Sequence, residues 1–382
     1  MVGTDHHRAG IGEKAVLTRN CAKLFKRLAD LIVQMPIRQT SHTPATDLSA
    51  PHDPGFDAAF ARGIAAASTL DAAQLGLPVI TAAGTTIRVG TASWTDPTMT
   101  KGGVFYPHGT STAESRLRYY ASQFSVVEVD STYYSLPAAG IAQLWADRTP
   151  PTFQFHVKAH ALMTGQPTEV ARLPQGLVSE LPATLRSQSK ICAKDLPPEL
   201  TDAVWAHFIA ALAPLRDADK LGSILLQYPR WFLPTAENTD LLAESALRLA
   251  GIPTTVELRN GIWFRDARAT QRTLELLRAL GLTHVIVDGP QGLKSSVPFV
   301  PEITTDSLSM VRFHGRRSAT WEAPGVATVE RYRYLYSEEE LHPLVESIRT
   351  VTKHVAQTVV FMNNCYGNYG ATNAREMLAM LG

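Results

Sequence analysis

Short runs of β-branched and aromatic residues recur along the chain from residue 86 onward. Eight of them can be identified: TIRVGTAS, SVVEVDST, TFQFHVK, GSILLQYP, TTVELR, THVIVD, MVRFHG and TVVFMNN. Segments with the apolar spacing of a helix separate most of these runs, at residues 112–123, 139–147, 199–218, 237–250, 267–280 and 338–354, and a last one follows at 371–381. The connection after the sixth run is irregular. Strands alternating with helices predict a parallel sheet, and eight such units predict an α/β fold of the closed (β/α)8 TIM-barrel type.

An open, doubly wound sheet also fits this alternation. Such a sheet often carries a phosphate-binding GxGxxG after its first strand, and TIRVGTASW has no such motif. We therefore favour the barrel.

The first 85 residues have a different pattern. AVLTRNCAKLFKRLADLIVQM has apolar positions at helical spacing, and the following PIRQTSHTPATDLSAPHDPG has the Pro, Ser and Thr content of a linker. A second short helix is expected at about residues 56–75. We predict an N-terminal appendage over residues 1–85 and a barrel domain over residues 86–382, with translation from Met35 as an alternative.

Composition and charge narrow the functional classes. Apolar residues make up 45% of the 382 positions, which is enough for a large core. The 36 Lys and Arg nearly balance the 35 Asp and Glu, for a formal net charge of +1. This balance provides no broad basic surface, so we expect no binding to duplex nucleic acid.

The cysteines and the apolar runs indicate a location. Cys21, Cys192 and Cys365 lie far apart without a CxxC pair, which fits neither a disulfide framework nor a zinc cluster. No apolar run approaches the roughly 18 residues that span a membrane. The start, MVGTDHHRAGIGEKAVLTRN, lacks the apolar segment of a signal peptide. We predict a cytoplasmic protein without membrane contact.

Nearly every predicted strand turns polar toward its carboxyl end. In chain order these residues are Ser93, Trp94, Glu128, Asp130, Thr132, His156, Lys158, Gln227, Glu257, Arg259, Asp288, Arg312, His314, Asn363 and Asn364. Within the second, third, fifth and seventh strands the polar residues are spaced by two, so they point to the same side. In barrels the chemistry lies at the carboxyl ends of the strands, so we predict a site there.

The charges at these ends have both a structural and a functional interpretation. Four acids and three bases can neutralise each other in a buried network, but buried ion pairs contribute little net stability. This favours a functional site. We predict catalytic roles for Glu128, Glu257, Asp288 and His314. We predict substrate binding by Trp94, Asp130, Lys158, Arg259, Arg312, Asn363, Asn364 and Asn373.

The last loop, NNCYGNYGATNAREML, is a second candidate for anion binding. Its glycines let backbone N–H groups approach an anion, and Thr372 or Asn373 is expected to open a helix whose N-terminus favours negative charge. An ordinary helix cap fits the same residues.

The same residues also suggest three other kinds of site: a metal site, a glycosidase pair and a cysteine nucleophile. Glu128, Glu257, Asp288 and His314 are acceptable ligands for a divalent metal, but the interleaved Arg and Lys repel a cation, so we predict no metal and no cofactor. Glu128 with Glu257 fits a glycosidase pair. Cys365 with His314 fits a nucleophile and its base, although an inert cysteine is favoured.

Aromatic residues also follow the strand ends. They include four of the six tryptophans, Trp94, Trp231, Trp263 and Trp321. These rings either stack on a ligand or fill the loops. The long stretch of residues 315–337 after the seventh strand is a candidate lid.

Several motifs together resemble a known family. They are VGTASW, VFYP, VEVDSTYYSLP, FHVKA, ILLQYP, VELRNGIW, VRFHG, YRYLYSEEEL and NNCYGNYGATNA, in this order from about Ile87 to the C-terminus. The chain is similar to the YecE-like family of unknown function (domain of unknown function seventy-two). The resemblance implies a TIM-type barrel and no agreed reaction.

The chain departs from this family at three places. Asp130 stands where an asparagine is usual, Thr164-Gly165 replaces a Thr-His pair, and residues 159–199 form a longer connection.

The leading hypothesis is an enzyme acting by general acid/base chemistry on a small polar, anionic substrate such as a sugar phosphate or a nucleotide fragment. One alternative is a non-catalytic ligand-sensing or partner-binding barrel. Another is a divalent-metal-dependent hydrolase or isomerase. The sequence leaves the oligomeric state open.

Overall fold

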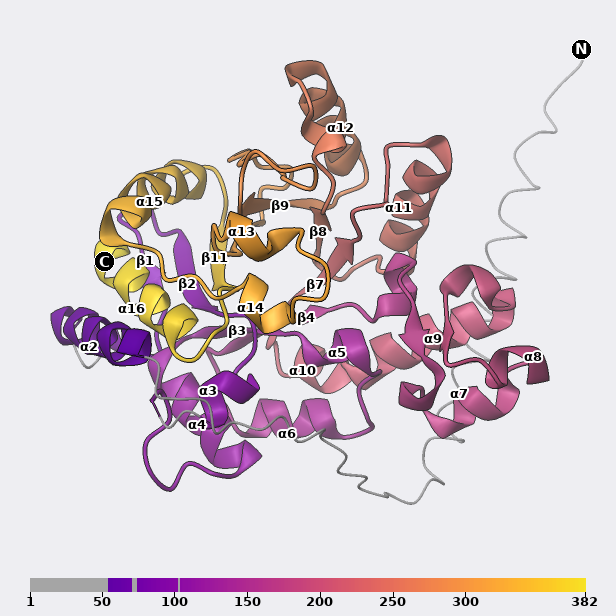
Figure 1. Cartoon of the computed structure of the whole chain (residues 1–382), viewed down its shortest axis with the longest axis horizontal. Coiled ribbons are helices and arrows are strands. Elements are labelled where there is room, and N and C mark those ends of the chain that lie inside the picture. Colours follow the sequence, from indigo (N-terminus) through magenta and orange to yellow (C-terminus); the bar gives the residue numbers. More distant parts are fainter. Residues whose placement is uncertain (1–53, 71–73, 102–103) are drawn as a thin grey trace, which may run out of the picture. The chain divides into compact units, whose positions relative to one another are not determined.

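A computed structural model describes residues 54–70, 74–101 and 104–382. The helix and linker predicted within the first 53 residues, and the alternative start at Met35, lie outside the described residues. Residues 52–382 form one compact unit, and the strands lie in its middle with helices around them (Figure 1).

The main sheet has nine strands within the described residues. In spatial order they are β1 (Val79–Ile80), β2 (Thr86–Thr91), β11 (Gln357–Met362), β10 (Leu308–Phe313), β9 (Thr283–Asp288), β8 (Thr254–Leu258), β7 (Leu221–Tyr228), β4 (Gln154–Lys158) and β3 (Val126–Val129). β1 is antiparallel to β2, whereas the other paired strands run parallel. A second sheet pairs β5 (Thr168–Glu169) with β6 (Lys190–Ile191).

The helices fill the connections between the strands. The α-helices are α2 (Pro54–Thr69), α3 (Pro97–Lys101), α4 (Ala113–Gln123), α5 (Ser131–Tyr134), α6 (Ile141–Asp147), α7 (Gln175–Glu180), α8 (Ala183–Arg186), α9 (Pro198–Ala211), α10 (Ala213–Asp217), α11 (Ala236–Arg248), α12 (Ala267–Ala279), α13 (Ser318–Trp321), α14 (Thr328–Arg331), α15 (Glu338–Thr352) and α16 (Tyr369–Leu381). The 3-10 helices are η2 (Ala161–Thr164), η3 (Val170–Arg172), η4 (Ala193–Asp195) and η5 (Gly261–Phe264). Side-chain caps fix several of the starts. At α15, for example, Ser337 and Glu340 form a reciprocal capping box.

The prediction of a closed (β/α)8 barrel is wrong. The alternation of strands and helices is present, but the ladder is a mixed, curled sheet that is not continuous between β2 and β3. These two strands meet at one isolated bridge, between Ala92 and Glu128. The Tyr120 hydroxyl takes the place of further ladder bonds, because it accepts from the Thr91 N–H at 2.8 Å and donates to the Val126 carbonyl at 3.2 Å. The strands also approach closely here, since a Cβ on Gly90 would lie 2.2 Å from the Val126 oxygen.

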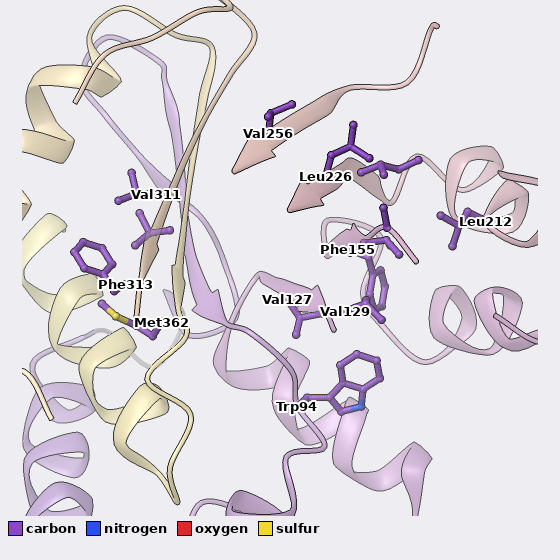
Figure 2. Close-up of a cluster of buried hydrophobic side chains, with 14 of the residues drawn as sticks. Trp94, Val127, Val129, Phe155, Leu212, Leu226, Val256, Val311, Phe313 and Met362 are labelled. Carbon is purple, nitrogen blue, oxygen red and sulfur yellow. The ribbon is translucent and has the colours of Figure 1, made fainter. Parts of the chain in front are cut away.

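The sheet has two apolar layers. The outer layer packs against the helices, and Figure 2 shows Val311, Phe313 and Met362 on the side of the C-terminal helices. The inner layer is a separate cluster of Val126, Leu225, Val285, Val287, Leu308, Met310, Val359 and Phe361. Neighbouring residues of one strand divide between the layers, as the period of two requires. This division identifies the inner face of the curled sheet.

The helix expected at residues 56–75 is present as α2 and packs against α16. The Thr372 hydroxyl donates to the Ala59 carbonyl at 2.6 Å, and Arg62 Nε lies 2.8 Å from Glu376 Oε1. Together with the pairing of β1 to β2, these contacts tie residues preceding Thr86 to the sheet.

Candidate functional site

A polar layer follows the inner apolar cluster toward the carboxyl ends of the strands. Its members share the inner face with that cluster. They are Glu128, Asp130, Lys158, Gln227, Glu257, Arg259, Arg312, His314 and Asn363. Polar residues at or directly after the ends of β3, β4, β7, β8, β10 and β11 therefore lie together, as their spacing by two predicted.

Arg312 is the centre of this layer. It is fully buried on β10 and donates from Nε to Glu128 Oε2 at 2.8 Å and from Nη2 to Glu128 Oε1 at 2.5 Å. Its Nη1 donates to Glu257 Oε2. One guanidinium thus holds two fully buried carboxylates that come from β3 and β8.

His314 extends the network from Glu257. Its Nδ1 lies 2.7 Å from the Asn363 amide nitrogen, which can only donate, so Nδ1 accepts. Nε2 then carries the proton and donates to Glu257 Oε1 at 3.1 Å. We name Glu128, Glu257, Arg312 and His314 the central cluster.

The two carboxyl groups on Arg312 have pKa values that are shifted in opposite directions. Burial raises the pKa of Glu128 to about 8, with a smaller contribution from the nearby Asp130, and this outweighs the opposing effect of Arg312. Burial also acts on Glu257, but Arg312, His314 and Arg259 together hold the pKa of Glu257 well below its ordinary value. Burial lowers the pKa of His314 to about 4, so its imidazole is neutral at neutral pH.

Asp130 and Lys158 lie at the more exposed edge of the layer. The Lys158 ammonium is 3.6 Å from Asp130 Oδ1 and 4.6 Å from the centre of the Tyr133 ring. Burial raises the pKa of Asp130, but Lys158 and Arg312 lower it by more. Asp130 Oδ1 has no hydrogen-bond partner among the described residues, although the side chain is 27% exposed. Because Oδ1 itself is buried, a ligand can reach only the exposed part of this carboxylate.

A pocket of about 320 Å³ opens above the central cluster. Its lining includes Gln227 and Arg259, which also contact Glu257: Gln227 Nε2 donates to Oε1 at 3.0 Å, and Arg259 Nε lies 3.4 Å away. Arg230 and Arg331 add two more guanidinium groups, and the described lining contains no acidic residue. We name this space the arginine pocket.

Two aromatic rings from the 315–337 segment cover His314. Trp321 lies 6.2 Å and Tyr332 5.9 Å from the imidazole, between ring centres, and Arg259 lies over Trp321 at 5.3 Å. Both rings line the arginine pocket. The segment that the sequence suggested as a lid therefore supplies part of the wall of the pocket.

Several predicted site residues lie apart from the central cluster. Trp94 is in the outer apolar layer (Figure 2), and its ring packs against those of Trp145 and Phe155. Trp263 is also buried, and its Nε1 donates to the Phe232 carbonyl at 2.8 Å. Of the four tryptophans, Trp231 and Trp321 line the arginine pocket.

Asp288 has the opposite orientation on β9, because Val287 next to it belongs to the inner layer. It accepts from Arg316 Nη2 at 2.7 Å and from the Tyr336 hydroxyl at 2.6 Å. Arg316 also lies 3.4 Å from Glu340. We name Asp288, Arg316, Tyr336 and Glu340 the latch, because it ties both ends of the 315–337 segment to the sheet.

Asn364 and Asn373 hold this segment from the side of the last helix. Asn364 Nδ2 donates to the Tyr334 carbonyl and to Asn373 Oδ1, each at 2.8 Å, and Asn373 Nδ2 donates to the Tyr336 carbonyl at 3.0 Å. The helix begins at Tyr369, so Thr372 and Asn373 lie one turn inside it and are buried. Their polar atoms bind protein groups.

Cys365 does not contact His314. Its thiol donates to the Ala92 carbonyl at 3.0 Å, and burial raises its pKa well above the ordinary value. Within the described ranges, no group of three or more His, Cys, Asp or Glu is arranged to hold a metal ion.

Four residues of the site were missed by the sequence interpretation. Arg230, Arg331 and Tyr332 line the arginine pocket from loops and from α14, where no periodic pattern marks them. Gln166 joins two parts of the site, donating to the Gln227 carbonyl at 3.0 Å and accepting from the Tyr133 hydroxyl at 2.9 Å. The YRYLY motif was a usable signal for Tyr332.

Fold and site together define an α/β protein with a buried charged cluster and an arginine-lined pocket at the carboxyl ends of its parallel strands. The family model described as protein of unknown function DUF72 matches residues 88–382, and the chain belongs to this family. The resemblance to domain of unknown function seventy-two is thereby confirmed, whereas the comparisons give no support for the YecE-like label.

Relatives agree with this assignment. The UPF0759 protein YunF of Bacillus subtilis (strain 168) is 32% identical over 298 residues, which cover 77% of this chain and 94% of YunF. A crystal structure of a DUF72 family protein from Thermotoga maritima MSB8 is 31% identical with a TM-score of 0.60, covering 77% of this chain and 98% of that one. Another, from Enterococcus faecalis V583, is 26% identical with a TM-score of 0.62, covering 77% and 95%. Among the described residues, no helix has the length and apolar character needed to cross a membrane.

Proposed function

We propose that this DUF72 protein is an enzyme that uses general acid/base chemistry on a small anionic substrate, such as a sugar phosphate or a nucleotide-like molecule. The observation that carries the proposal is the pair of carboxyl groups on Arg312. They share one guanidinium, yet one pKa is raised to about 8 and the other is held low. Carboxyl groups whose environments separate their pKa values are typical of acid/base sites.

The arginine pocket supports an anionic substrate. Arg259, Arg230 and Arg331 line it, and no acidic residue is part of its described lining, although Arg259 also contacts Glu257 below it. Planar guanidinium groups match phosphate or carboxylate oxygens. Arg312, which the sequence also suggested as an anion ligand, has its donors directed to Glu128 and Glu257. In this proposal it positions the two carboxyl groups.

Glu128 supplies the acid/base function. A group with a pKa near the working pH is an efficient proton donor and acceptor, and Glu128 is the carboxyl of the cluster with this property. Asp130 lies two residues further along the same face and is partly exposed. It connects the buried Glu128 to the substrate, while Glu257 stays ionised and His314 keeps it in position.

The test is turnover by wild-type protein and by Glu128→Gln, which keeps the shape of the side chain. A panel of sugar phosphates and nucleoside monophosphates is incubated with each protein, and products are detected by phosphorus NMR and mass spectrometry. Binding is measured in parallel by calorimetry. We expect the variant to bind the same compound and to lose at least about 100-fold in turnover. Equal turnover by both proteins contradicts the role of Glu128.

A non-catalytic ligand-binding protein is the second candidate, and the complete burial of Glu128 and Glu257 favours it. In that case wild-type protein binds an anion from the panel and returns it unchanged. We place either function in the cytoplasm without a cofactor. This part of the proposal has the support of the sequence interpretation.

A further inference from the structure

A second, larger pocket lies beside the arginine pocket. It has a volume of about 770 Å³ and is built by η2 and η4 of the long connection after β4, by α9, and by one side of α11. Apolar side chains dominate its lining: Leu162, Met163, Pro167, Trp205, Pro229, Trp231, Phe232 and Leu241. Pockets of roughly 300–1,000 Å³ with mainly apolar walls are the usual size and character of small-molecule sites. We name it the apolar pocket.

The two pockets share a rim. Pro229 and Trp231 line both of them. Gln166 lines the arginine pocket, whereas its neighbours Gly165 and Pro167 line the apolar pocket. Two chain segments, residues 165–167 and 229–231, therefore form the boundary between the two pockets, and each segment lines both of them.

Trp231 is the unusual member of this rim. It is 58% exposed, whereas Trp205 in the wall of the apolar pocket is 6% exposed. A large indole that is left in water between two pockets is available to a ligand that covers it, and aromatic rings are frequent anchors in binding sites.

The two pockets differ in the charge of the residues that line them. The arginine pocket has three guanidinium groups and no acid in its described lining. The apolar pocket has one lysine, Lys194, and two glutamates, Glu237 and Glu244. Glu244 lies 2.8 Å from Arg248 in an ion pair. An anionic group is thus attracted to the first pocket and is not favoured in the second.

We propose that the two pockets form one binding site for a free small molecule with an anionic group and an apolar body. The anionic group lies in the arginine pocket, and the body passes over Trp231 into the apolar pocket. This inference rests on the proposed function, from which it takes the binding of an anionic group in the arginine pocket, and it specifies the class of ligand further. It differs from a purely polar sugar phosphate in requiring an apolar body.

The probes are inorganic phosphate, ethyl phosphate, butyl phosphate, octyl phosphate and octanol, measured by isothermal titration calorimetry on the full chain. Burial of each methylene group contributes about 0.8 kcal/mol, so we expect the affinity to rise about fourfold per methylene until the pocket is filled. Octanol lacks the anion and is expected to bind more weakly than octyl phosphate.

The variant Ala193→Trp places an indole in the apolar pocket, because Ala193 is part of its lining. Its matched control is Ala183→Trp, at an exposed position of α8 outside both pockets. We expect Ala193→Trp to lower the affinity for octyl phosphate at least about tenfold while ethyl phosphate is unaffected, since one to two lost methylene contacts already give this factor. Trp231→Ala is a surface change with a lower risk of misfolding, and because the indole lines both pockets we expect it to weaken octyl phosphate more than ethyl phosphate, without leaving ethyl phosphate unchanged.

The outcomes separate this inference from the proposed function. If phosphates bind without any gain from chain length, the shared site is wrong and the anion pocket stands. If only octanol binds, or if no probe binds, both the shared site and the anion pocket are overturned. Cosedimentation with vesicles that contain phosphatidic acid, but no binding of octyl phosphate, would overturn the free ligand in favour of a lipid surface.

Discussion

The central cluster and the latch are both built from an acid near the carboxyl end of a strand and an arginine of the β10 region. In the central cluster, Arg312 and its two carboxylates lie on the inner face and are out of contact with water. In the latch, Asp288 lies on the other face and its partner Arg316 is 34% exposed. The same ion-pair chemistry is therefore placed in two very different environments.

This difference determines what each cluster can do. The pKa values of completely buried ionisable groups are strongly shifted, and each charge depends on its partner for compensation. Such a cluster is better suited to proton transfer than to stabilising the fold. An ion pair with one exposed partner, such as Arg316 with the buried Asp288, holds segments together at a smaller desolvation cost. The latch contacts Gly315, whose N–H donates to the Tyr336 hydroxyl at 2.9 Å, and so fixes the segment that places Trp321 and Tyr332 over His314. It supports the site without belonging to it.

Removing the shared cation should have the largest effect. Arg312→Met leaves the buried charge of Glu257 without its main partner and the mainly neutral Glu128 without its donors, so we expect the free energy of unfolding to fall by about 3–5 kcal/mol. Urea denaturation at neutral pH measures this. Arg118→Met is the control, because this arginine pairs with Glu114 on the surface of α4 and is 57% exposed. It should unfold like the wild type.

A triple variant shows whether unpaired charge is the cause. When Glu128→Gln and Glu257→Gln are added to Arg312→Met, no buried charge loses its partner, and much of the stability should return. If the triple variant is as unstable as Arg312→Met, packing of the long arginine side chain is responsible instead.

The pH dependence of stability isolates Glu128. Its pKa is about 8 in the folded protein against 4.5 for the free side chain. Below pH 4.5 the group is neutral in both states and its stabilising contribution is complete. As the pH rises toward 8, the unfolded chain loses the proton first, so the free energy of unfolding falls. The fall is on the order of 4 kcal/mol over this window.

Glu128→Gln cannot titrate, so the difference between wild type and variant gives the contribution of this residue. Urea denaturation at several pH values between 4 and 9 provides the comparison. Parallel curves for the two proteins would show that the pKa of Glu128 is ordinary in the folded state.

The sequence predicted the strands and their inner face but not the closure of the sheet. Period-two patterns identify which side chains point inward, and this is a local property of each strand. Whether β2 and β3 pair depends on Tyr120, a helical residue whose hydroxyl reaches the Thr91 N–H and the Val126 carbonyl. Nothing in the pattern of α4 distinguishes that hydroxyl from any other tyrosine on an apolar face.

The same reasoning explains which site residues could be predicted. Glu128, Glu257 and Arg312 lie on regular strands and His314 directly follows one, so spacing determines their direction. Asp288 was grouped with them because it also ends a strand, but its parity places it on the other face. Arg230, Gln166 and Arg331 lie on loops or on a one-turn helix, and their positions depend on tertiary contacts that no local pattern encodes.

Loss of the Tyr336 hydroxyl tests the latch. In Tyr336→Phe, Asp288 loses one donor and the buried Gly315 N–H loses its acceptor, so we expect the free energy of unfolding to fall by about 2 kcal/mol. Because the latch holds both ends of the 315–337 segment, hydrogen exchange should rise there more than in the sheet.

The control for the latch is Tyr134→Phe, since this tyrosine is 50% exposed. Loss of the Tyr134 hydroxyl should change neither the free energy of unfolding nor the hydrogen exchange of residues 315–337. Uniform acceleration of exchange over the whole of Tyr336→Phe would mean that the latch stabilises the entire unit and not the segment.

The smallest effect is expected at the edge of the central cluster, where Asp130 and Lys158 influence the pKa of Glu128. Asp130→Asn removes a negative charge that raises the pKa of Glu128, and Lys158→Met removes a positive charge that lowers it. The two side chains are 27% and 12% exposed, so water screens their charges in part, and each change should alter stability at pH 7 by on the order of 1 kcal/mol. The pH window over which stability falls should nevertheless move down in Asp130→Asn and up in Lys158→Met. Urea denaturation across the same pH range detects these opposite shifts.

If the pH windows of both variants move in the same direction, the pKa of Glu128 responds to altered packing and not to charge. The central cluster would then be no more sensitive to a nearby charge than the latch is.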